Sequence, residues 1–222
     1  MKITLAKTAG FCFGVDRAVD TVYDLLEKGK RVCTLGPIIH NAQLVTELES
    51  KGVITVNSPD EVKTGETLVI RSHGVGKKLY DYAEKTGLDV VDATCPFVEK
   101  IHRIVYEQSS NGDTVLIAGD KNHKEVEGII GHCKGDVYTF TDTYELENLL
   151  QNNQYFGEKP LTVVSQTTFN AEKWKKAQEI LKKVCTNAKI FDTICNATSL
   201  RQLEAKELAT VNDVIVVIGG RH

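Results

Sequence analysis

Three cysteines recur in one local setting, the junction between a short apolar run and a helix-like pattern. Asp92 and Asp192 each stand three residues before a cysteine, Cys95 or Cys195, and apolar residues at helical spacing follow both cysteines. Cys12 repeats the arrangement more loosely. Each cysteine is therefore predicted at a helix N-terminus, where the helix dipole and unpaired backbone N–H groups favour the thiolate and metal binding.

The spacing of these cysteines separates them from common zinc motifs. They lie 83 and 100 residues apart, whereas zinc fingers and ribbons take their ligands in close pairs. Such wide spacing indicates three similar lobes that each contribute one thiolate to a common centre. Soft thiolate ligands suit an iron–sulfur cluster, and three cysteines leave one iron open as a Lewis acid. The alternative is three cysteines buried separately in hydrophobic cores.

Polar residues collect where predicted strands end. His40, His73 and His123 follow strand-like runs, and Thr167 with Thr168 follows another. Ligands of open α/β sheets bind beyond the carboxyl ends of the strands, and imidazoles, hydroxyls and helix N-termini suit a phosphate or diphosphate. The alternative for each histidine is a solvent-exposed or capping residue. Neither G-x-x-x-x-G-K-[ST] nor G-x-G-x-x-G occurs, so neither an NTPase nor a dinucleotide fold is indicated.

Glu125 stands in the first turn of a predicted helix, two residues after His123. It could act there as a general acid, or serve only as a carboxylate favoured by the helix dipole, and its position does not separate the two. The other cysteines fit no repeat. We expect Cys33 in a strand core, Cys133 in a turn and Cys185 at a helix end.

Strand and helix patterns alternate along the whole chain, which predicts an α/β fold with mainly parallel sheets. The strand runs are apolar rather than alternating, as in sheets covered on both faces. Strands are predicted at residues 31–35, 52–56, 67–71, 89–92, 113–118, 136–140, 161–165, 189–192 and 213–218, with a looser one at 3–5. Helices are predicted at 15–28, 41–51, 77–86, 97–110, 124–132, 143–151, 171–184 and 197–209.

Composition limits the classes of function. The 222 residues carry a net charge of −3, so no basic field favours nucleic acid or a membrane surface. The N-terminus shows no signal peptide, and no apolar run approaches the length of a membrane span. The six cysteines form no recognisable disulfide framework. We expect a cytoplasmic protein with no nucleic-acid or membrane partner.

At these residues the chain resembles the LytB-type 4-hydroxy-3-methylbut-2-enyl diphosphate reductase family. The matching segments follow the family order through nearly the whole chain, and together they are highly specific. They are residues 9–15, 36–41, 71–75, 92–96, 119–120 with His123 and Glu125, 166–168 and 193–198.

The resemblance implies a fold and a cofactor. The fold would have three small α/β lobes with mainly parallel sheets, in pseudo-threefold arrangement around a central [4Fe–4S] cluster. Cys12, Cys95 and Cys195 would be the cluster ligands, with one iron left open. The lobes would comprise residues 14–95, residues 96–194, and an incomplete third made of 195–222 with 1–13.

The resemblance also implies a reaction. It is the two-electron, two-proton removal of an allylic hydroxyl, giving isopentenyl and dimethylallyl diphosphate in the non-mevalonate pathway. His40, His73, His123 and Thr167 would line the pocket of the allylic diphosphate substrate, and Glu125 would donate the proton. A ferredoxin- or flavodoxin-like protein would supply the electrons.

The chain departs from the family pattern at two places. Lys124 stands where proline is usual, which should change only the start of a helix. His222 stands where the family commonly has asparagine, and a following Ser-Ser-Asn run and a final βα portion are absent. We therefore expect a fragment of a longer reductase that binds diphosphate poorly and turns over little. Robust activity of the 222-residue chain would contradict this expectation.

Three other interpretations fit part of the pattern. An aconitase-like hydro-lyase would use the same open iron without net electron transfer. A non-enzymatic iron–sulfur sensor would need no diphosphate site, so the histidines argue against it. A closed zinc site of three cysteines and one histidine would be colourless and redox-silent.

Overall fold

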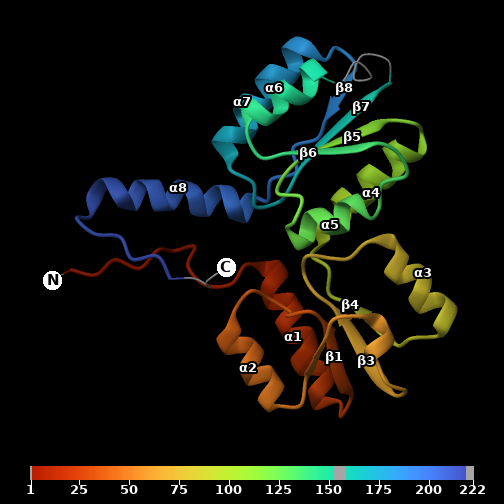
Figure 1. The fold of residues 1–222 in the computed structure, drawn as a ribbon. Coiled ribbons are helices and arrows are strands. Elements are labelled where there is room, and N and C mark those ends of the chain that lie inside the picture. Colours follow the sequence, from red (N-terminus) through yellow and green to blue (C-terminus); the bar gives the residue numbers. More distant parts are fainter. Residues whose placement is uncertain (1, 153–158, 219–222) are drawn as a thin grey trace. The chain divides into compact units, whose positions relative to one another are not determined.

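The computed structural model describes residues 2–152 and 159–218 and divides into two compact units. The first unit takes in the described residues up to Gly74, Lys78–Pro96 and the described residues from Leu200 onward. The second takes in Val75–Lys77 and Phe97–Ser199. Each unit holds one four-stranded parallel sheet with helices around it, which confirms the predicted α/β class (Figure 1). Within the described ranges, every helix is too short or too polar to span a membrane.

The first unit builds its sheet in the order β2-β1-β3-β4, with every neighbouring pair parallel. All four carboxyl ends therefore meet at one edge of the sheet. The elements are α1 (Phe13–Glu27), β1 (Arg31–Leu35), α2 (Ala42–Ser50), β2 (Ile54–Val56), the 3₁₀ turn η1 (Pro59–Glu61), β3 (Glu66–Ile70), α3 (Lys77–Thr86) and β4 (Val90–Asp92).

Burial on both faces explains the continuous apolar strands of this unit. Alternate residues of β1 point to opposite faces, so Val32 packs with Val22 of α1 and Leu48 of α2, while Cys33 packs with Leu68 in a smaller cluster on the other face. The start of α2 is fixed by Asn41 (the residue before it), whose side chain accepts a hydrogen bond from a backbone N–H of the first turn.

The second unit repeats the same strand order as β6-β5-β7-β8, again fully parallel. Its elements are α4 (Pro96–Ser110), β5 (Thr114–Ala118), α5 (Lys124–Ile130), β6 (Val137–Phe140), α6 (Thr143–Asn152), β7 (Leu161–Ser165), α7 (Ala171–Val184) and β8 (Ala188–Ile190).

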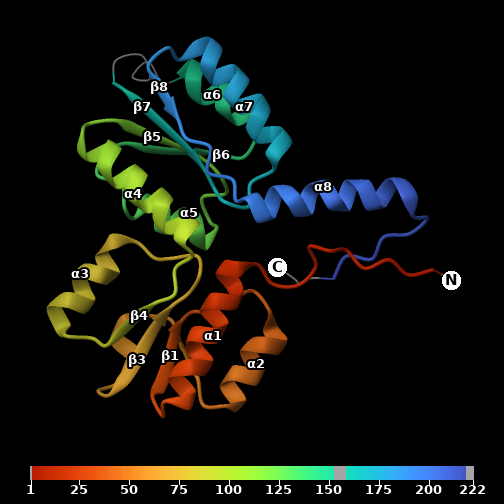
Figure 2. The same cartoon turned by 180° about the vertical axis from the view of Figure 1, so that it is seen from behind.

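Two helix pairs cover the faces of the second sheet (Figure 2). Ile117 of β5 packs with residues of α4 and α5, and its neighbour Leu116 packs with Trp174 of α7 and residues of α6. Every residue of β5 and β7 is buried, so these strands carry apolar side chains at successive positions.

The N-terminal segment is held by α8 (Asn196–Val211) rather than by a sheet. The Glu204 carboxylate accepts hydrogen bonds from the backbone N–H groups of Lys7, at 2.6 Å, and Thr8, at 2.8 Å. The Arg201 guanidinium donates to the carbonyl oxygens of Thr8, at 3.1 Å, and Gly10, at 2.7 Å. Side chains of α8 therefore form the hydrogen bonds with backbone N–H and C=O groups that a neighbouring strand would otherwise form.

The predicted strands at residues 3–5 and 213–218 are wrong. Both segments run as coil, and neither pairs with a strand in the part of the chain that the structure describes. Ile3 is 81% exposed and Ile218 is 93% exposed, so an apolar run alone did not bring a partner. His222, on which one departure from the family pattern rests, lies outside the described residues. The division into three lobes remains a prediction.

One close backbone approach in the second unit can be tested by adding a methyl group. A Cβ on Gly131, at the end of α5, would lie 2.5 Å from the Cα of Gly76, and Lys77 N donates to Gly131 O at 3.2 Å. We expect Gly131→Ala to push these backbones apart and lower the free energy of unfolding by about 1–3 kcal/mol, measured by urea denaturation. Gly135→Ala is the control, because its added Cβ meets no atom closer than 3.9 Å. Equal stability of the two variants would contradict this packing.

Candidate active site

The two inner strands of the first sheet lead to two of the predicted histidines. The chain passes from β1 to the β2 side and from β3 to the β4 side, so the boundary between β1 and β3 is the switch point where α/β sheets bind ligands. His40 follows β1 and His73 follows β3, and their ring centroids lie 5.0 Å apart at an interplanar angle of 61°. Arg71 donates to Leu35 O at 3.2 Å and so ties the two strand ends together.

The helix α1, which begins directly after Cys12, packs against Cys95 within the first unit. Cys12 is the N-cap of α1, and its carbonyl oxygen accepts from Val15 N at 2.9 Å. Cys95 directly precedes α4, and its backbone N donates to Ser72 O at 3.0 Å. Gly14 in the first turn of α1 packs against Cys95 so closely that an added Cβ would lie 2.6 Å from the Cys95 sulfur. The helix that starts at one predicted ligand therefore contacts the sulfur of the other.

In the second sheet, β5 and β7 hold the places of β1 and β3. His123 follows β5 and is the N-cap of α5, with its Nδ1 accepting a hydrogen bond from Glu125 N at 3.1 Å. A neutral His123 must then carry its proton on Nε2. An Nε2–H group is a hydrogen-bond donor suited to an anionic oxygen.

Glu125 is buried and is hydrogen-bonded to Thr167, the predicted site residue in the loop after β7. Only 2% of Glu125 is exposed. Thr167 donates twice, from its backbone N to Oε1 at 2.6 Å and from its hydroxyl to Oε2 at 2.7 Å. Burial raises the pKa of Glu125, and the two Thr167 hydrogen bonds lower it by less, so the net shift is above the ordinary 4.5. A carboxylate serving only the helix dipole would gain nothing from burial, so the surroundings favour the general-acid interpretation.

The Cys195 backbone is hydrogen-bonded to the loop that contains Thr167. Its backbone N donates to Thr167 O at 2.9 Å, and its carbonyl oxygen receives the first hydrogen bonds of α8. The Thr193 hydroxyl accepts from Ser165 N at 2.7 Å and donates to Ser165 O at 2.8 Å, which fixes the approach to Cys195 against the end of β7.

The two sheets thus deliver a cysteine in the same way. Each outer strand, β4 or β8, leads to a cysteine whose backbone N bonds to the loop after the neighbouring strand, at Ser72 O or Thr167 O. The repeated Asp-x-x-Cys pattern was the signal for this arrangement. The sequence reasoning missed Gly14, Arg71 and Thr193. All three stand in segments that support the resemblance, residues 9–15, 71–75 and 193–198, and this was the signal that could have found them.

The remaining cysteines are placed as predicted and are poor metal ligands. Burial raises the pKa of Cys33 in β1 to about 11 and that of Cys133, in the turn after α5, to about 12. Burial also raises the pKa of Cys185 at the end of α7. These thiols hold their protons, and a protonated thiol binds metal weakly.

Cys12, Cys95 and Cys195 differ from that set in ways that suit a metal centre. Each of the three stands immediately before a helix, whereas Cys33 lies in β1, Cys133 follows α5 and Cys185 ends α7. A set of thiol donors fits a soft, thiolate-bound cofactor such as an iron–sulfur cluster.

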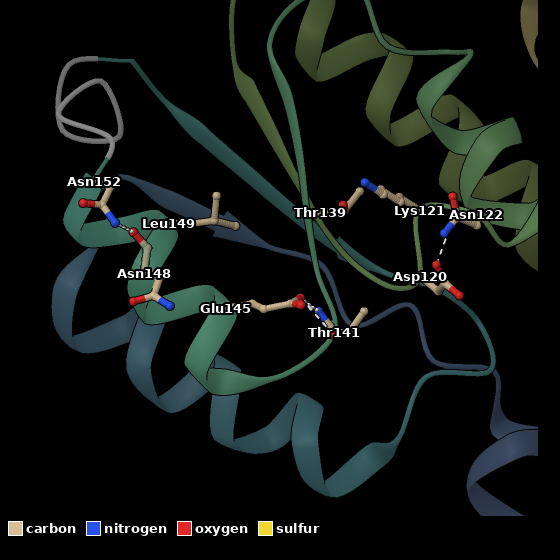
Figure 3. Close-up of a pocket in the computed structure, with 9 residues that line it drawn as sticks. All are labelled: Asp120, Lys121, Asn122, Thr139, Thr141, Glu145, Asn148, Leu149 and Asn152. Atoms are coloured by element: carbon tan, nitrogen blue, oxygen red, sulfur yellow. Dashed lines mark hydrogen bonds between the residues drawn. The ribbon is translucent and has the colours of Figure 1, made fainter.

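A hollow of about 560 Å³ opens in the second unit beside the loop that leads to His123 (Figure 3). Figure 3 shows side chains of α6 facing those of this loop, with Glu145 bound to Thr141 and Asp120 bound to Asn122 N. The carboxylates of Asp120 and Glu145 oppose an anionic ligand, and no predicted site residue lines the hollow. We therefore do not place a diphosphate there.

The Glu125–Thr167 contact predicts a measurable pKa change. Thr167→Val keeps the backbone hydrogen bond but removes the hydroxyl bond, which favours the ionised carboxylate. We expect the pKa of Glu125 to rise further, so that its carboxyl C=O infrared band persists to higher pH. Glu125→Gln assigns the band. Thr168→Val, at an exposed neighbour, is the control, and an unchanged or lower titration midpoint in Thr167→Val would contradict the geometry.

Comparison with known proteins gives consistent results. The LytB protein family model matches residues 3–222. The chain is 44% identical to the 4-hydroxy-3-methylbut-2-enyl diphosphate reductase of Thermoanaerobacter sp. (strain X514), with 100% of this chain and 76% of the relative covered. For the enzyme of the same name from Clostridioides difficile (strain 630), the identity is 41%, with 100% and 78% covered.

Two solved structures share the fold. One is an (E)-4-hydroxy-3-methyl-but-2-enyl diphosphate reductase described as the terminal enzyme of the non-mevalonate pathway, with a TM-score of 0.76, 39% identity, and 99% of this chain and 77% of that one covered. The other is the E-1-hydroxy-2-methyl-but-2-enyl-4-diphosphate reductase of Plasmodium falciparum, with a TM-score of 0.83, 28% identity, and 91% and 63% covered. With the family model spanning both sheets and all three repeated cysteines, the chain belongs to the LytB family.

Proposed function

We propose that this chain is a 4-hydroxy-3-methylbut-2-enyl diphosphate reductase of the non-mevalonate isoprenoid pathway. Beyond family membership, the observation that carries the proposal is the environment of Glu125. Glu125 is a buried carboxyl with a raised pKa, two residues after His123, and its partner Thr167 also binds Cys195 through the backbone. A proton donor, an anion-binding imidazole and a metal-binding thiol thus come from one sheet edge of the second unit.

The proposed cofactor is a [4Fe–4S] cluster bound by Cys12, Cys95 and Cys195. All three stand immediately before helices, and thiolates are the ligands that an iron–sulfur cluster takes. When bound, such a cluster supplies electrons and an iron with an open position that acts as a Lewis acid. The burial that raises the pKa of the other cysteines supports this choice of three among six.

The proposed substrate is an allylic diphosphate that carries a hydroxyl group. His40, His73 and His123 offer imidazole donors at the carboxyl ends of the inner strands, and Thr167, whose hydroxyl donates to Glu125, is the fourth polar residue. A diphosphate is recognised by imidazole donors. Binding the diphosphate through groups on rigid sheet edges orients the allylic end for reaction.

Glu125 supplies the proton that the leaving hydroxyl requires. Because burial raises its pKa, the carboxyl retains a proton at a pH where an exposed glutamate has lost it. Transfer of that proton lets the C–O bond break with water as the leaving group. Two electrons and a second proton complete the conversion to isopentenyl or dimethylallyl diphosphate, so the overall reaction consumes two electrons and two protons. The Thr167 hydrogen bonds then stabilise the carboxylate that Glu125 becomes.

The electrons must come from outside the chain, because the reaction consumes two per turnover. A ferredoxin- or flavodoxin-like protein is the proposed donor. The proposed setting is the cytoplasm, where a reducing environment keeps ligand cysteines as thiols. All six cysteines lie in the described part of the chain, and none of them forms a disulfide there.

Replacing one proposed ligand tests the cofactor. After anaerobic reconstitution with iron and sulfide, we expect Cys95→Ser to lose most of the bound iron, bound sulfide and brown visible absorption of the parent chain. Removal of one of three thiolates leaves too few ligands to hold the cluster. Cys185→Ser is the matched control at a buried cysteine and should keep the parent values. A Cys95→Ser variant with full iron content, or a parent chain that is colourless and binds zinc instead, would overturn the proposal.

Replacing the proposed acid tests the chemistry. In an otherwise complete enzyme, Glu125→Gln preserves shape and removes the proton, so we expect turnover to fall by roughly 10²–10⁴-fold, the usual contribution of a general acid, while cluster absorption is unchanged. The assay follows both product and the oxidation of a reduced viologen dye. Product without dye oxidation would identify a hydro-lyase instead. Turnover of Glu125→Gln close to that of the parent would remove Glu125 from the mechanism.

A further inference from the structure

Arg17 links the helix of one proposed ligand to the loop of another. It lies on α1, five residues after Cys12, and its guanidinium reaches the segment that leads to Cys95. One Arg17 nitrogen donates to Thr94 O at 2.6 Å and the other to Asp92 O at 3.3 Å. Both hydrogen bonds lie within the first unit and join parts of the chain more than 70 residues apart.

The segment of residues 92–95, to which Arg17 donates, forms its other hydrogen bonds through different atoms. The Asp92 carboxylate accepts from Thr94 N at 2.8 Å and from the Tyr80 hydroxyl at 2.8 Å. Cys95 N donates to Ser72 O at 3.0 Å. These bonds hold the segment to its own sheet and to α3, but only the Arg17 bonds among these tie it to the helix that starts at Cys12.

The contact that Arg17 maintains involves the Cys95 sulfur itself. The first turn of α1 lies so close to Cys95 that a Cβ on Gly14 would be 2.6 Å from the sulfur. A planar guanidinium that donates two hydrogen bonds fixes orientation as well as distance, which a single flexible donor cannot do. Loss of this fork would let α1 and the Cys95 loop move relative to each other.

We propose that Arg17 is a positioning residue that sets the spacing between the Cys12 and Cys95 sulfurs, so that both are in place before a cluster is bound. The inference rests on the proposed function, since it takes these cysteines as ligands. It assigns a role to a residue that touches neither the substrate nor the cluster. Ligands held in advance lose less freedom on binding, so the cluster is held more tightly.

The test measures how fast iron leaves the reconstituted chain when a strong ferrous chelator is added under anaerobic conditions. Two hydrogen bonds from a charged donor are lost in Arg17→Gln, and we expect iron release roughly tenfold faster or more. Arg17→Lys keeps the charge but not the fork, and should fall between the parent and Arg17→Gln. Arg31→Gln is the matched control, because Arg31 also donates to a backbone carbonyl, Thr64 O at 2.5 Å, at the far end of β1.

A second readout uses the chain without a cluster. Hydrogen exchange of the peptide spanning residues 92–98 should be faster in Arg17→Gln than in the parent, with urea midpoints of Arg17→Gln and Arg31→Gln close to each other. If the parent holds iron but Arg17→Gln releases it at the parent rate, the positioning role is overturned and the proposed function stands. If the parent holds no iron after reconstitution, both are overturned.

Discussion

Parallel strand pairing is the constraint on which the rest of the molecule depends. Because every pair in both sheets is parallel, each sheet presents all its carboxyl ends at one edge. The shared order, with β1 beside β3 and β5 beside β7, puts a switch point at the centre of each sheet. His40 and His73 follow one central pair, and His123 and Thr167 follow the other. Side chains that are far apart in sequence are thereby grouped without any long loop.

Within that frame, the way a carboxyl group is buried distinguishes a chemical role from a structural one. Asp113 is 3% exposed, but its charge is met by the Lys189 ammonium at 3.0 Å and the Thr162 hydroxyl at 2.7 Å. Glu125 is buried equally deeply and accepts hydrogen bonds of 2.6 and 2.7 Å from neutral groups of Thr167. A cation beside a buried carboxylate stabilises the ionised form, whereas neutral donors offset only part of the desolvation. The second arrangement fits the proposed role of Glu125 as a proton donor.

Most of this frame was predictable from the sequence because its signals are local. β1 and β7 have the predicted bounds, as do α3 and α7, since apolar runs and helical periods are read within a few residues. The strands predicted at 3–5 and 213–218 do not form, because a strand needs a neighbouring strand to pair with and a local sequence pattern does not supply one. The backbone of the N-terminal segment instead forms hydrogen bonds with Arg201 and Glu204 of a helix that is distant in sequence. Gly14 stands in a recognisable motif and Arg17 lies just after it, yet their contacts with the Cys95 loop depend on tertiary packing that no local pattern encodes.

The two units therefore position a cysteine with the same kind of backbone hydrogen bond but with different side chains. In each, a cysteine after an outer strand bonds its N–H to a loop after the neighbouring strand, Ser72 in one case and Thr167 in the other. The first unit then braces that cysteine with Arg17 from a helix, and the second braces it with Thr193 bound to Ser165 of a strand. The backbone hydrogen bond follows from the shared strand order, so it is repeated in both units. The braces depend on which element lies beside each cysteine, and these differ, which is why repetition in sequence is confined to Asp-x-x-Cys.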